Sequence, residues 1–271
     1  MFKVIEAFEK ICRKQKVKFS LNSNVERINI DDGVATSLCV NGKDIPADLV
    51  LATADYHHVD QHLLPKQYRS YSPKYWNNRK MSPSCMIFYL GLNKKISHFL
   101  HHTLFFDEDR DTHMEQIFDR PQWPTAPLLY VSCPSKTDNS LIPDGGECLF
   151  VLIPVAVGLE DTEETRQHYY DLAINRMEHV TDQKLREHII FKRSYAHKDY
   201  VSDFNAMKGN AFGLANTLMQ TAVLKPKIRS NKVKNLFFAG QLTTPGPGVP
   251  PCIISGQVVA TEVQRELTTG K

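Results

Sequence analysis

The chain has 271 residues, of which 42% are hydrophobic and 23% charged, as in ordinary globular proteins of one or two domains. A net charge of +3 gives no argument for nucleic-acid binding, and no apolar stretch reaches the roughly 18 residues that would span a bilayer. The six cysteines are scattered without a C-x-x-C pair, which favours free thiols in a reducing compartment over a disulfide framework or a zinc site. The N-terminus is charged throughout and unlike a signal peptide, so we expect a cytoplasmic protein, soluble or peripheral.

The first 54 residues predict a helix followed by short strands. Apolar residues at three-to-four spacing predict an amphipathic helix over 2–15. Alternating residues predict strands at 17–21 and 25–30, and an Asp-Asp-Gly turn leads back into a third at 34–40. Residues 49–54 are almost wholly apolar, which predicts a strand buried on both faces of a layered α/β sheet.

The middle of the chain has a different pattern. Strands are predicted at 85–92, 128–132 and 148–155, and a helix at 163–180. Long polar and aromatic loops connect them. This mixture predicts an α+β domain of the kind that binds substrates.

The α/β pattern returns near the C-terminus, with a strand at 233–239 and a helix at 253–267. We therefore predict one domain built from both chain ends, residues 1–55 and 231–271, with a second domain inserted at 56–230.

The segment between the last strand and the last helix is rich in glycine and proline. Gly240 follows the apolar strand directly and would let another backbone or a ligand approach closely, because it has no Cβ atom. Prolines stiffen the loop, and the helix start that follows carries unpaired N–H groups and partial positive charge. The unit is therefore a candidate cradle for a phosphate or a polarised ring. The alternative is a tight crossover that uses these residues only for turning.

Long segments of the chain resemble one family. The stretch NLFFAGQLTTPGPGVPPCIISGQVVA is similar to the C-terminal signature of the phytoene desaturase-like carotenoid desaturases, which are FAD-dependent flavoproteins. VKFSLNSNVERI and ADLVLATAD resemble the FAD-domain segment of that family, and SCMIFYLGLNKKI resembles the strand that enters its substrate domain. The resemblance covers essentially the whole chain. It implies removal of hydrogen from phytoene or a related carotene, with flavin as the hydride acceptor.

The resemblance also implies an incomplete fold. The family carries its Gly-rich dinucleotide-binding βαβ unit at the N-terminus, and this chain begins like the middle of a family member. We therefore expect an α/β plus α+β chain, with an incomplete FAD/NAD(P)-binding Rossmann-like domain and an inserted mixed-sheet substrate domain. Expected partners are a long-chain isoprenoid or carotene, a membrane surface contacted peripherally, and possibly an N-terminal companion chain, with no nucleic acid.

Matching positions in the family imply a set of FAD-binding residues. Val25 would contact the adenine through its backbone, unless it is an ordinary strand residue. Ala54 would end the buried strand beside the cofactor, unless it is a simple hinge. Gly240 and Gln241 would pack beside the ribityl chain and phosphates. The start of the last helix would lie near the flavin ring through Val249, Pro250 and Ile253, and Gly256 would serve close packing.

Several alternatives stay open. The same fold would suit a carotene isomerase, a ketolase or a retinol saturase-like protein. A non-catalytic remnant, or a half that needs a separate N-terminal chain, is a further alternative. No catalytic residue and no metal ligand is predicted, although Asp55, His57 and Arg79 could lie near a substrate tunnel. Aromatic residues within 68–76 and 105–118 could line that tunnel, contact a membrane or pack in the core.

Overall fold

Three sheets organise the part of the chain that the computed structural model describes, residues 2–269. An antiparallel sheet contains β1 (Val25–Asp31), β2 (Val34–Val40) and β3 (Lys43–Pro46). A parallel pair contains β4 (Val50–Ala52) and β10 (Leu236–Phe238). An antiparallel sheet has the order β6-β7-β8-β5-β9 and is built from β5 (Ser84–Leu92), β6 (His102–Phe105), β7 (Leu129–Ser132), β8 (Glu147–Val155) and β9 (Ile189–Tyr195).

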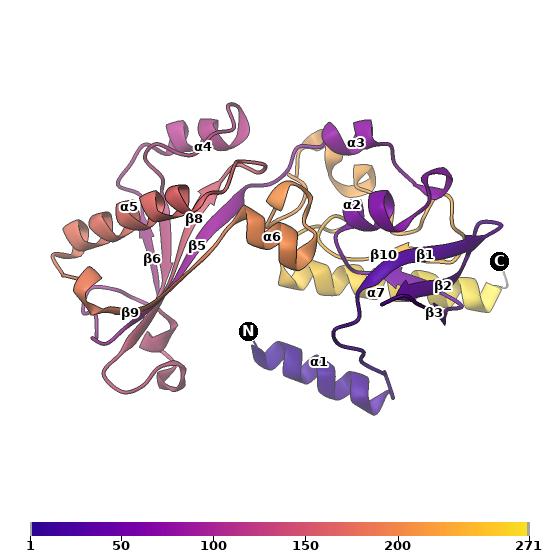
Figure 1. Ribbon diagram of the computed structural model, residues 1–271, viewed down its shortest axis with the longest axis horizontal. Helices are drawn as coiled ribbons and strands as arrows, with labels where there is room; N and C mark the ends of the chain where they lie inside the picture. Colours follow the sequence, from indigo (N-terminus) through magenta and orange to yellow (C-terminus); the bar gives the residue numbers. More distant parts are fainter. Residues whose placement is uncertain (1, 270–271) are drawn as a thin grey trace.

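Seven α-helices are present among the same residues. They are α1 (Phe2–Lys14), α2 (Tyr56–His58), α3 (Pro73–Asn77), α4 (Arg110–Phe118), α5 (Glu163–Thr181), α6 (His197–Phe204) and α7 (Val249–Thr269). Figure 1 shows the five-stranded sheet with α5 at one end of the molecule and the small sheets with α7 at the other, with α6 between them.

The parallel pair joins segments from the two ends of the chain. Val50 lies opposite Leu236, and Ala52 opposite Phe238. Both strands were predicted from their apolar runs. Burial on both faces of β4 was wrong, however, because Val50 is buried whereas Leu51 is 44% exposed. In the described part of the chain β4 pairs with β10 alone, and Leu51 lines a cavity described below.

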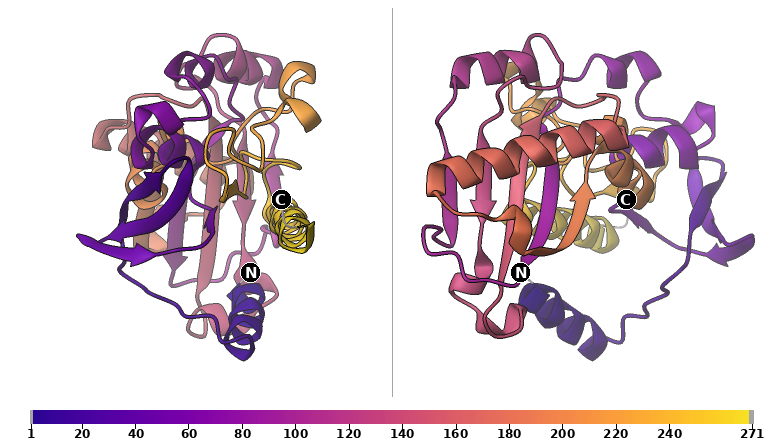
Figure 2. Two further views of the ribbon diagram at one scale, coloured as in Figure 1. Left: turned by 90° about the vertical axis from the view of Figure 1, so that its right-hand side faces the viewer. Right: turned by 60° about the vertical axis from the view of Figure 1, so that its left-hand side comes forward.

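The N-terminal helix lies away from the rest of the molecule. The amphipathic pattern is confirmed as a helix, but none of its described side chains is buried. Its apolar stripe of Phe2, Ile5, Phe8 and Ile11 faces solvent. Figures 1 and 2 show α1 joined to the rest of the molecule by an extended segment. The predicted strand at 17–21 falls in this segment and was wrong: these residues alternate in polarity, but no other strand pairs with them.

The five-stranded sheet is covered on one face. Alternate residues of β5, Met86, Phe88 and Leu90, point into a core that α5 closes with Tyr170 and Ile174. The right-hand view of Figure 2 shows α5 lying across this face. The opposite face presents the other residues of β5, and it is discussed below as a binding surface.

The domain boundaries at 55 and 231 stay a prediction, and the buried apolar residues form two main clusters. One cluster is formed by the five-stranded sheet and α5. The other combines residues of β1 and β10 with Tyr56, Trp76 and Met207. Tyr56, for example, stacks on Phe238 at a centroid distance of 3.7 Å. The aromatic residues within 68–76 belong to this second core, so core packing was the correct alternative for them.

Candidate functional site

A cavity of about 740 Å³ opens where β4 and β10 end. One wall follows β4 through Thr53, Ala54 and Asp55, and another follows β10 through residues 239–243. Helix α6 and the loop after it supply a third wall, and α7 supplies Cys252 and Gly256. Ligands of open α/β sheets bind outside the carboxyl ends of the strands, which is the position of this cavity. Its size is in the range of ordinary ligand sites.

The turn after β10 is held in one conformation by α7. Gly240 has a φ of +116°, a conformation that side chains with a Cβ atom rarely adopt. Its N–H donates to Ser255 Oγ of α7 at 3.0 Å, and its carbonyl accepts from Thr243 Oγ1 at 2.8 Å. The hydroxyls of Thr243 and Ser255 are themselves 2.8 Å apart, and both residues are buried. The cavity edge at Gly240 is thus preorganised by hydrogen bonds.

Gln241 ties the turn to the loop after α6. Its side-chain amide donates to Asn210 Oδ1 at 3.1 Å, and the same oxygen accepts the N–H of Gly213 at 2.9 Å. Asn210 is almost fully buried and also donates to Met207 O. A Cβ atom on Gly213 would lie 3.0 Å from Gln241 O, so the two loops are in close contact. The Gln241 side chain therefore already has a structural partner in Asn210.

Asp55 is a buried carboxyl in the cavity wall. One oxygen accepts the N–H of His58 at 3.1 Å and caps α2, and the other accepts the N–H of Met207 at 3.3 Å. Burial raises the pKa of this carboxyl above its usual value, although the two backbone donors oppose the shift. Asp55 lines the cavity, and its proximity to a substrate tunnel stays a prediction. His57 instead packs against Trp76, and Arg79 lies over the ring of Tyr75.

The last helix begins at Val249, four residues before the predicted start. Pro250 and Pro251 occupy its first turn, where the backbone N–H that proline lacks has no partner within a helix. The Cys252 N–H bonds to Gly248 O at 2.9 Å. Val249 and Ile253 are 47% and 44% exposed, so both side chains are available to a ligand. Close packing at Gly256 was wrong, because a Cβ atom there would meet nothing within 4 Å in the described structure.

The structure brings together most of the predicted FAD-binding residues. Ala54, Gly240 and Gln241 line the cavity directly. Val249, Pro250 and Ile253 lie on the first turns of α7, whose Cys252 and Gly256 line it. Val25 does not join this group: it begins β1 and packs against the second core. The role of each residue toward a cofactor stays a prediction.

Sequence reasoning missed the wall formed by α6. Tyr200 and Phe204 of this helix line the cavity, and the Tyr200 hydroxyl lies 2.8 Å from Cys85 Sγ on β5. No local motif marks these residues, because their proximity to Gly240 arises from tertiary packing. The one available signal was the short amphipathic pattern of 197–204.

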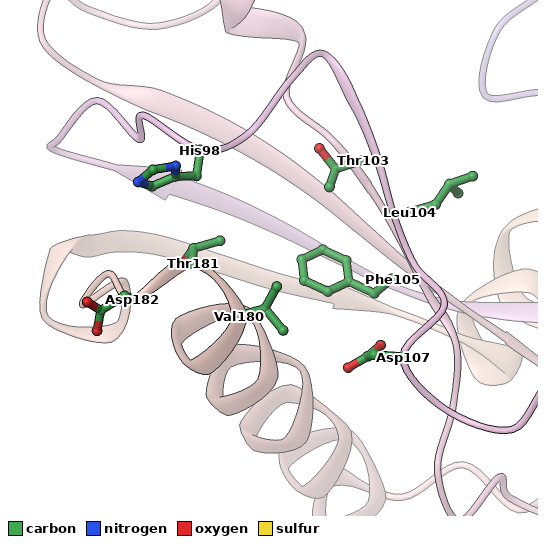
Figure 3. Close-up of a pocket in the computed structure, with 8 residues that line it drawn as sticks. All are labelled: His98, Thr103, Leu104, Phe105, Asp107, Val180, Thr181 and Asp182. Carbon is green, nitrogen blue, oxygen red and sulfur yellow. The ribbon is translucent and has the colours of Figure 1, made fainter.

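A second cavity, of about 420 Å³, lies at the far edge of the five-stranded sheet (Figure 3). Its walls are β6 and the end of α5, and none of the predicted FAD-binding residues lines it. Asp107, which borders it, forms an ion pair with Arg176. This site has no contact with the parallel strands, so we assign the chemistry to the larger cavity.

Residues 2–269 contain neither a candidate metal site nor a candidate membrane-spanning helix. No group of three or more potential metal ligands comes together there. None of the helices in the same range is both long enough and apolar enough to cross a membrane.

Comparisons with known proteins show the family to which the chain belongs. The model of the family described as flavin-containing amine oxidoreductase matches residues 2–264. A carotenoid 3,4-desaturase of Haloarcula japonica is 38% identical over 95% of this chain and 52% of its own length. A zeta-carotene-forming phytoene desaturase of Myxococcus xanthus is 30% identical over 96% of this chain and 50% of its own. The chain thus spans about half the length of these curated relatives.

Among solved structures, an oxidoreductase from Methanosarcina mazei superimposes with a TM-score of 0.63 at 13% identity. The match covers 96% of this chain and 53% of the other. At this identity the likeness establishes the fold alone. It agrees with the mixed arrangement of sheets and helices described above.

Proposed function

The chain belongs to the flavin-containing amine oxidoreductases, and from this membership we propose that it takes part in FAD-dependent desaturation of phytoene or a related carotene. One observation carries the proposal: the two parallel strands from opposite ends of the chain end at one cavity, with Ala54 and Gly240 at its edge. The names of the relatives supply the substrate class.

The residues present fit a flavin. The Gly240 turn has no Cβ atom to obstruct a close approach and is locked by Ser255 and Thr243. Ala54 and the backbone of Gln241 would border the cofactor on the strand side. The start of α7 would border its ring, where the positive end of the helix favours electron density. In this proposal the parallel strands and α7 form the incomplete Rossmann-like part of the fold.

The chemistry requires little from acidic or basic side chains. The cofactor, when bound, supplies the acceptor for hydride. The chain's own residues would hold the cofactor at the Gly240 turn, which Thr243 and Ser255 fix, and Tyr56 and Tyr200 would exclude water from the cavity. Positioning of the substrate over the ring then dominates the rate.

The open face of the five-stranded sheet suits a long isoprenoid. Tyr89 of β5 lies 5.5 Å from Phe150 of β8, and Phe150 lies 6.3 Å from Tyr130 of β7, as ring centroids. Together with Phe191, Tyr89 and Phe150 line an apolar cavity of about 480 Å³. Cys85 shares this face of β5, because alternate residues of a strand point the same way. Its contact with Tyr200 therefore connects the apolar face to the flavin cavity.

We also propose that the chain contacts a membrane surface peripherally. A carotene is a hydrocarbon, which dissolves in lipid and not in water. Sedimentation of the chain with lipid vesicles would test this. A chain that remains wholly in the supernatant at every lipid concentration would contradict it.

We further propose that activity needs a second polypeptide, which corresponds to the half of the relatives that this chain does not match. The unpaired edge of β4, the exposed Leu51 and the solvent-facing stripe of α1 support this. Buried parallel sheets are normally covered on both faces. The partner expected is a strand-and-helix unit that extends the sheet at β4.

Product analysis tests the activity. We would assay the chain with FAD and phytoene in lipid vesicles, alone and with the unmatched part of the Haloarcula japonica relative. Desaturation is expected only with both polypeptides, as products that have lost hydrogen and absorb at longer wavelength. Products with unchanged hydrogen count would favour an isomerase, and products that gain oxygen would favour a ketolase. No product under any condition would favour the non-catalytic alternative.

A further inference from the structure

Three apolar side chains project into solvent from one short loop. The loop consists of two 3₁₀ turns, Leu218–Gln220 and Ala222–Leu224, and we refer to it as the 218–224 loop. Leu218 is 90% exposed, Met219 78% and Val223 94%. Val223 and Leu218 are the two most exposed large apolar side chains in residues 2–269. Apolar side chains this exposed and this close in sequence mark an interaction surface.

Hydrogen bonds anchor the backbone of the 218–224 loop. Gln220, which lies between the apolar side chains in sequence, is only 4% exposed. Its side-chain oxygen accepts the N–H of Lys80 at 3.2 Å, and its side-chain amide donates to Ala215 O at 2.8 Å. Thr244 Oγ1 donates to Ala222 O at 3.1 Å. The apolar side chains are therefore held outward by a backbone that is fixed on both sides of them.

The segments around the loop are basic. Residues 61–83 and 204–234 contain eleven of the 33 lysines and arginines of the chain and none of its 30 aspartates and glutamates. The two segments lie side by side, because Lys80 bonds to the loop and the Lys227 N–H donates to Tyr71 Oη at 2.9 Å. Both lysines are exposed. The loop thus projects from two segments whose only formal charges are positive.

This combination is complementary to a membrane surface that contains anionic lipid. Peripheral binding strengthens with the apolar area that enters the acyl boundary, and with the attraction between basic side chains and anionic headgroups. The loop provides the apolar area and the flanking lysines provide the attraction. A protein partner would also cover the apolar side chains, but it would not in general require neighbouring segments without acidic residues.

The loop is also connected to the flavin cavity. Thr244, which donates to Ala222 O, directly follows Thr243, a residue of the cavity wall. A membrane bound by the loop would therefore supply a lipid-dissolved substrate close to the cavity edge.

We propose that the 218–224 loop inserts its three exposed apolar side chains into the surface of a membrane that contains anionic lipid, with Lys80 and Lys227 against the headgroups. The inference rests on the membrane contact proposed above, and it assigns that contact to one loop and one class of lipid.

The test measures binding of the purified chain to lipid vesicles by sedimentation. One set of vesicles is phosphatidylcholine alone, and the other is an equimolar mixture with phosphatidylglycerol, which is anionic. The parent chain should bind the mixed vesicles about tenfold or more tightly at low salt. This preference should decrease as salt is added, because salt screens exposed charges.

Apolar variants test the loop itself. The double variant Leu218→Ser, Val223→Ser should weaken binding to both kinds of vesicle by about tenfold or more, because it removes side chains that enter the lipid. Its melting temperature should match that of the parent, since both side chains are almost wholly exposed. Leu104→Ser removes an exposed apolar side chain from β6 and should leave vesicle binding unchanged.

Charge variants test the class of lipid. Lys80→Gln and Lys227→Gln should each weaken binding to the mixed vesicles about fivefold at low salt, and should leave binding to phosphatidylcholine unchanged. Lys184→Gln is the control, because it removes the same charge from an exposed residue outside the two basic segments.

A fluorescent variant reports insertion without relying on a loss of binding. The added fluorescence of Leu218→Trp over the parent chain should shift to shorter wavelength on the mixed vesicles. It should also be quenched by lipids with brominated acyl chains. Emission that stays at the wavelength of water-exposed tryptophan on saturated vesicles would contradict insertion.

The failures are distinguishable. If the double serine variant binds vesicles as tightly as the parent, the role of the loop is overturned and the membrane contact stands. If that variant instead loses only its binding to the unmatched part of the Haloarcula japonica relative, the loop is a protein interface and the assignment is overturned. Equal binding of the parent to both kinds of vesicle would overturn the choice of anionic lipid. If the parent binds neither kind, the loop's role and the proposed membrane contact are both overturned, whereas product analysis still decides the desaturation activity.

Discussion

Gly240 is the residue on which the geometry of the cavity depends most. Its φ of +116° turns the chain out of β10, and its N–H and C=O are both bonded to neighbouring hydroxyls. The sequence identified this position because a glycine directly after a buried strand is unusual. It did not identify Ser255 or Asn210, since a serine within a helix and an asparagine in a loop acquire these partners only when the segments meet.

Gly240→Ala should destabilise the chain by about 1–3 kcal/mol, because alanine is strained at this φ. Chemical denaturation measures the change. Gly256→Ala is the matched control: this glycine lies inside α7 with free space around it, so alanine should stabilise the chain by about 0.5–1 kcal/mol. Equal effects of the two substitutions would contradict the assignment of a special backbone conformation to Gly240.

Asp55 should give the stability of the chain a distinctive pH dependence. Its pKa is raised in the folded state, so its contribution to the free energy of unfolding is fully present below the unfolded value of about 4. The contribution is lost as the pH rises through the folded pKa. The difference in stability between the parent and Asp55→Asn should therefore decrease from acid toward neutral pH.

Asp109 is the control, because its pKa is shifted in the direction opposite to that of Asp55. It caps α4, and a hydrogen bond from Thr112 lowers its pKa. Its contribution is present above the unfolded pKa and is lost as the pH falls through the folded one. The difference between the parent and Asp109→Asn should thus decrease toward acid pH. A difference for Asp55→Asn that is constant with pH would contradict the buried state of that carboxyl.

At the scale of elements, an ion network fixes α6, the helix that the sequence did not assign to the site. Arg166 of α5 forms two hydrogen bonds with Asp161, at 2.7 and 2.6 Å, and a third with Asp199 of α6 at 2.7 Å. Arg166 Nη1 also donates to Ser194 of β9 at 3.2 Å. Through these contacts α5 and β9 hold α6, so that Tyr200 and Phe204 face the cavity.

Arg166→Met should cost about 3–5 kcal/mol, because it leaves the buried Asp161 carboxylate without its partner. Thermal and chemical denaturation measure this. Arg110→Met removes an exposed ion pair with Asp111 and should produce no measurable change. If Arg166→Met were as stable as the parent, the network would not be what positions α6.

Helices and strands were predicted well where the local sequence pattern determines the structure. They were predicted poorly where contacts with neighbouring elements determine it. Three strands of the five-stranded sheet, β5, β7 and β8, and the helix α5 appeared near their predicted places, whereas β6 and β9 were not predicted. The strand predicted at 17–21 has the right alternation but no partner strand. β4 has the composition of a strand buried on both faces, yet Leu51 is 44% exposed because it faces the cavity rather than a packed layer.

At the scale of the whole molecule, exposed apolar side chains occur at both ends of the chain as well as in its middle, for example at Leu104 and Leu218. The stripe on α1, Leu51 on β4 and Ile253 on α7 all belong to the two ends of the chain. Exposed apolar side chains that lie together, such as the stripe on α1, mark an interaction surface. We interpret it as the surface that the second polypeptide covers, with the membrane as the alternative occupant.

The double variant Ile5→Lys, Ile11→Lys should reduce self-association of the isolated chain, measured by sedimentation velocity. Its melting temperature should stay the same, since neither side chain contacts the body. A lower melting temperature would show that α1 packs against the fold in solution. Loss of vesicle binding with unchanged self-association would identify a membrane surface as the occupant of the stripe.

Hydrogen exchange with and without FAD tests the central claim, the location of the flavin site, most directly. At saturating FAD, the account predicts slower exchange of the backbone amides of residues 240–243 and of the first turns of α7, with no change along α1 or at the cavity between β6 and α5. Protection at the β6–α5 cavity, or none at residues 240–243 once binding is saturated, would contradict it.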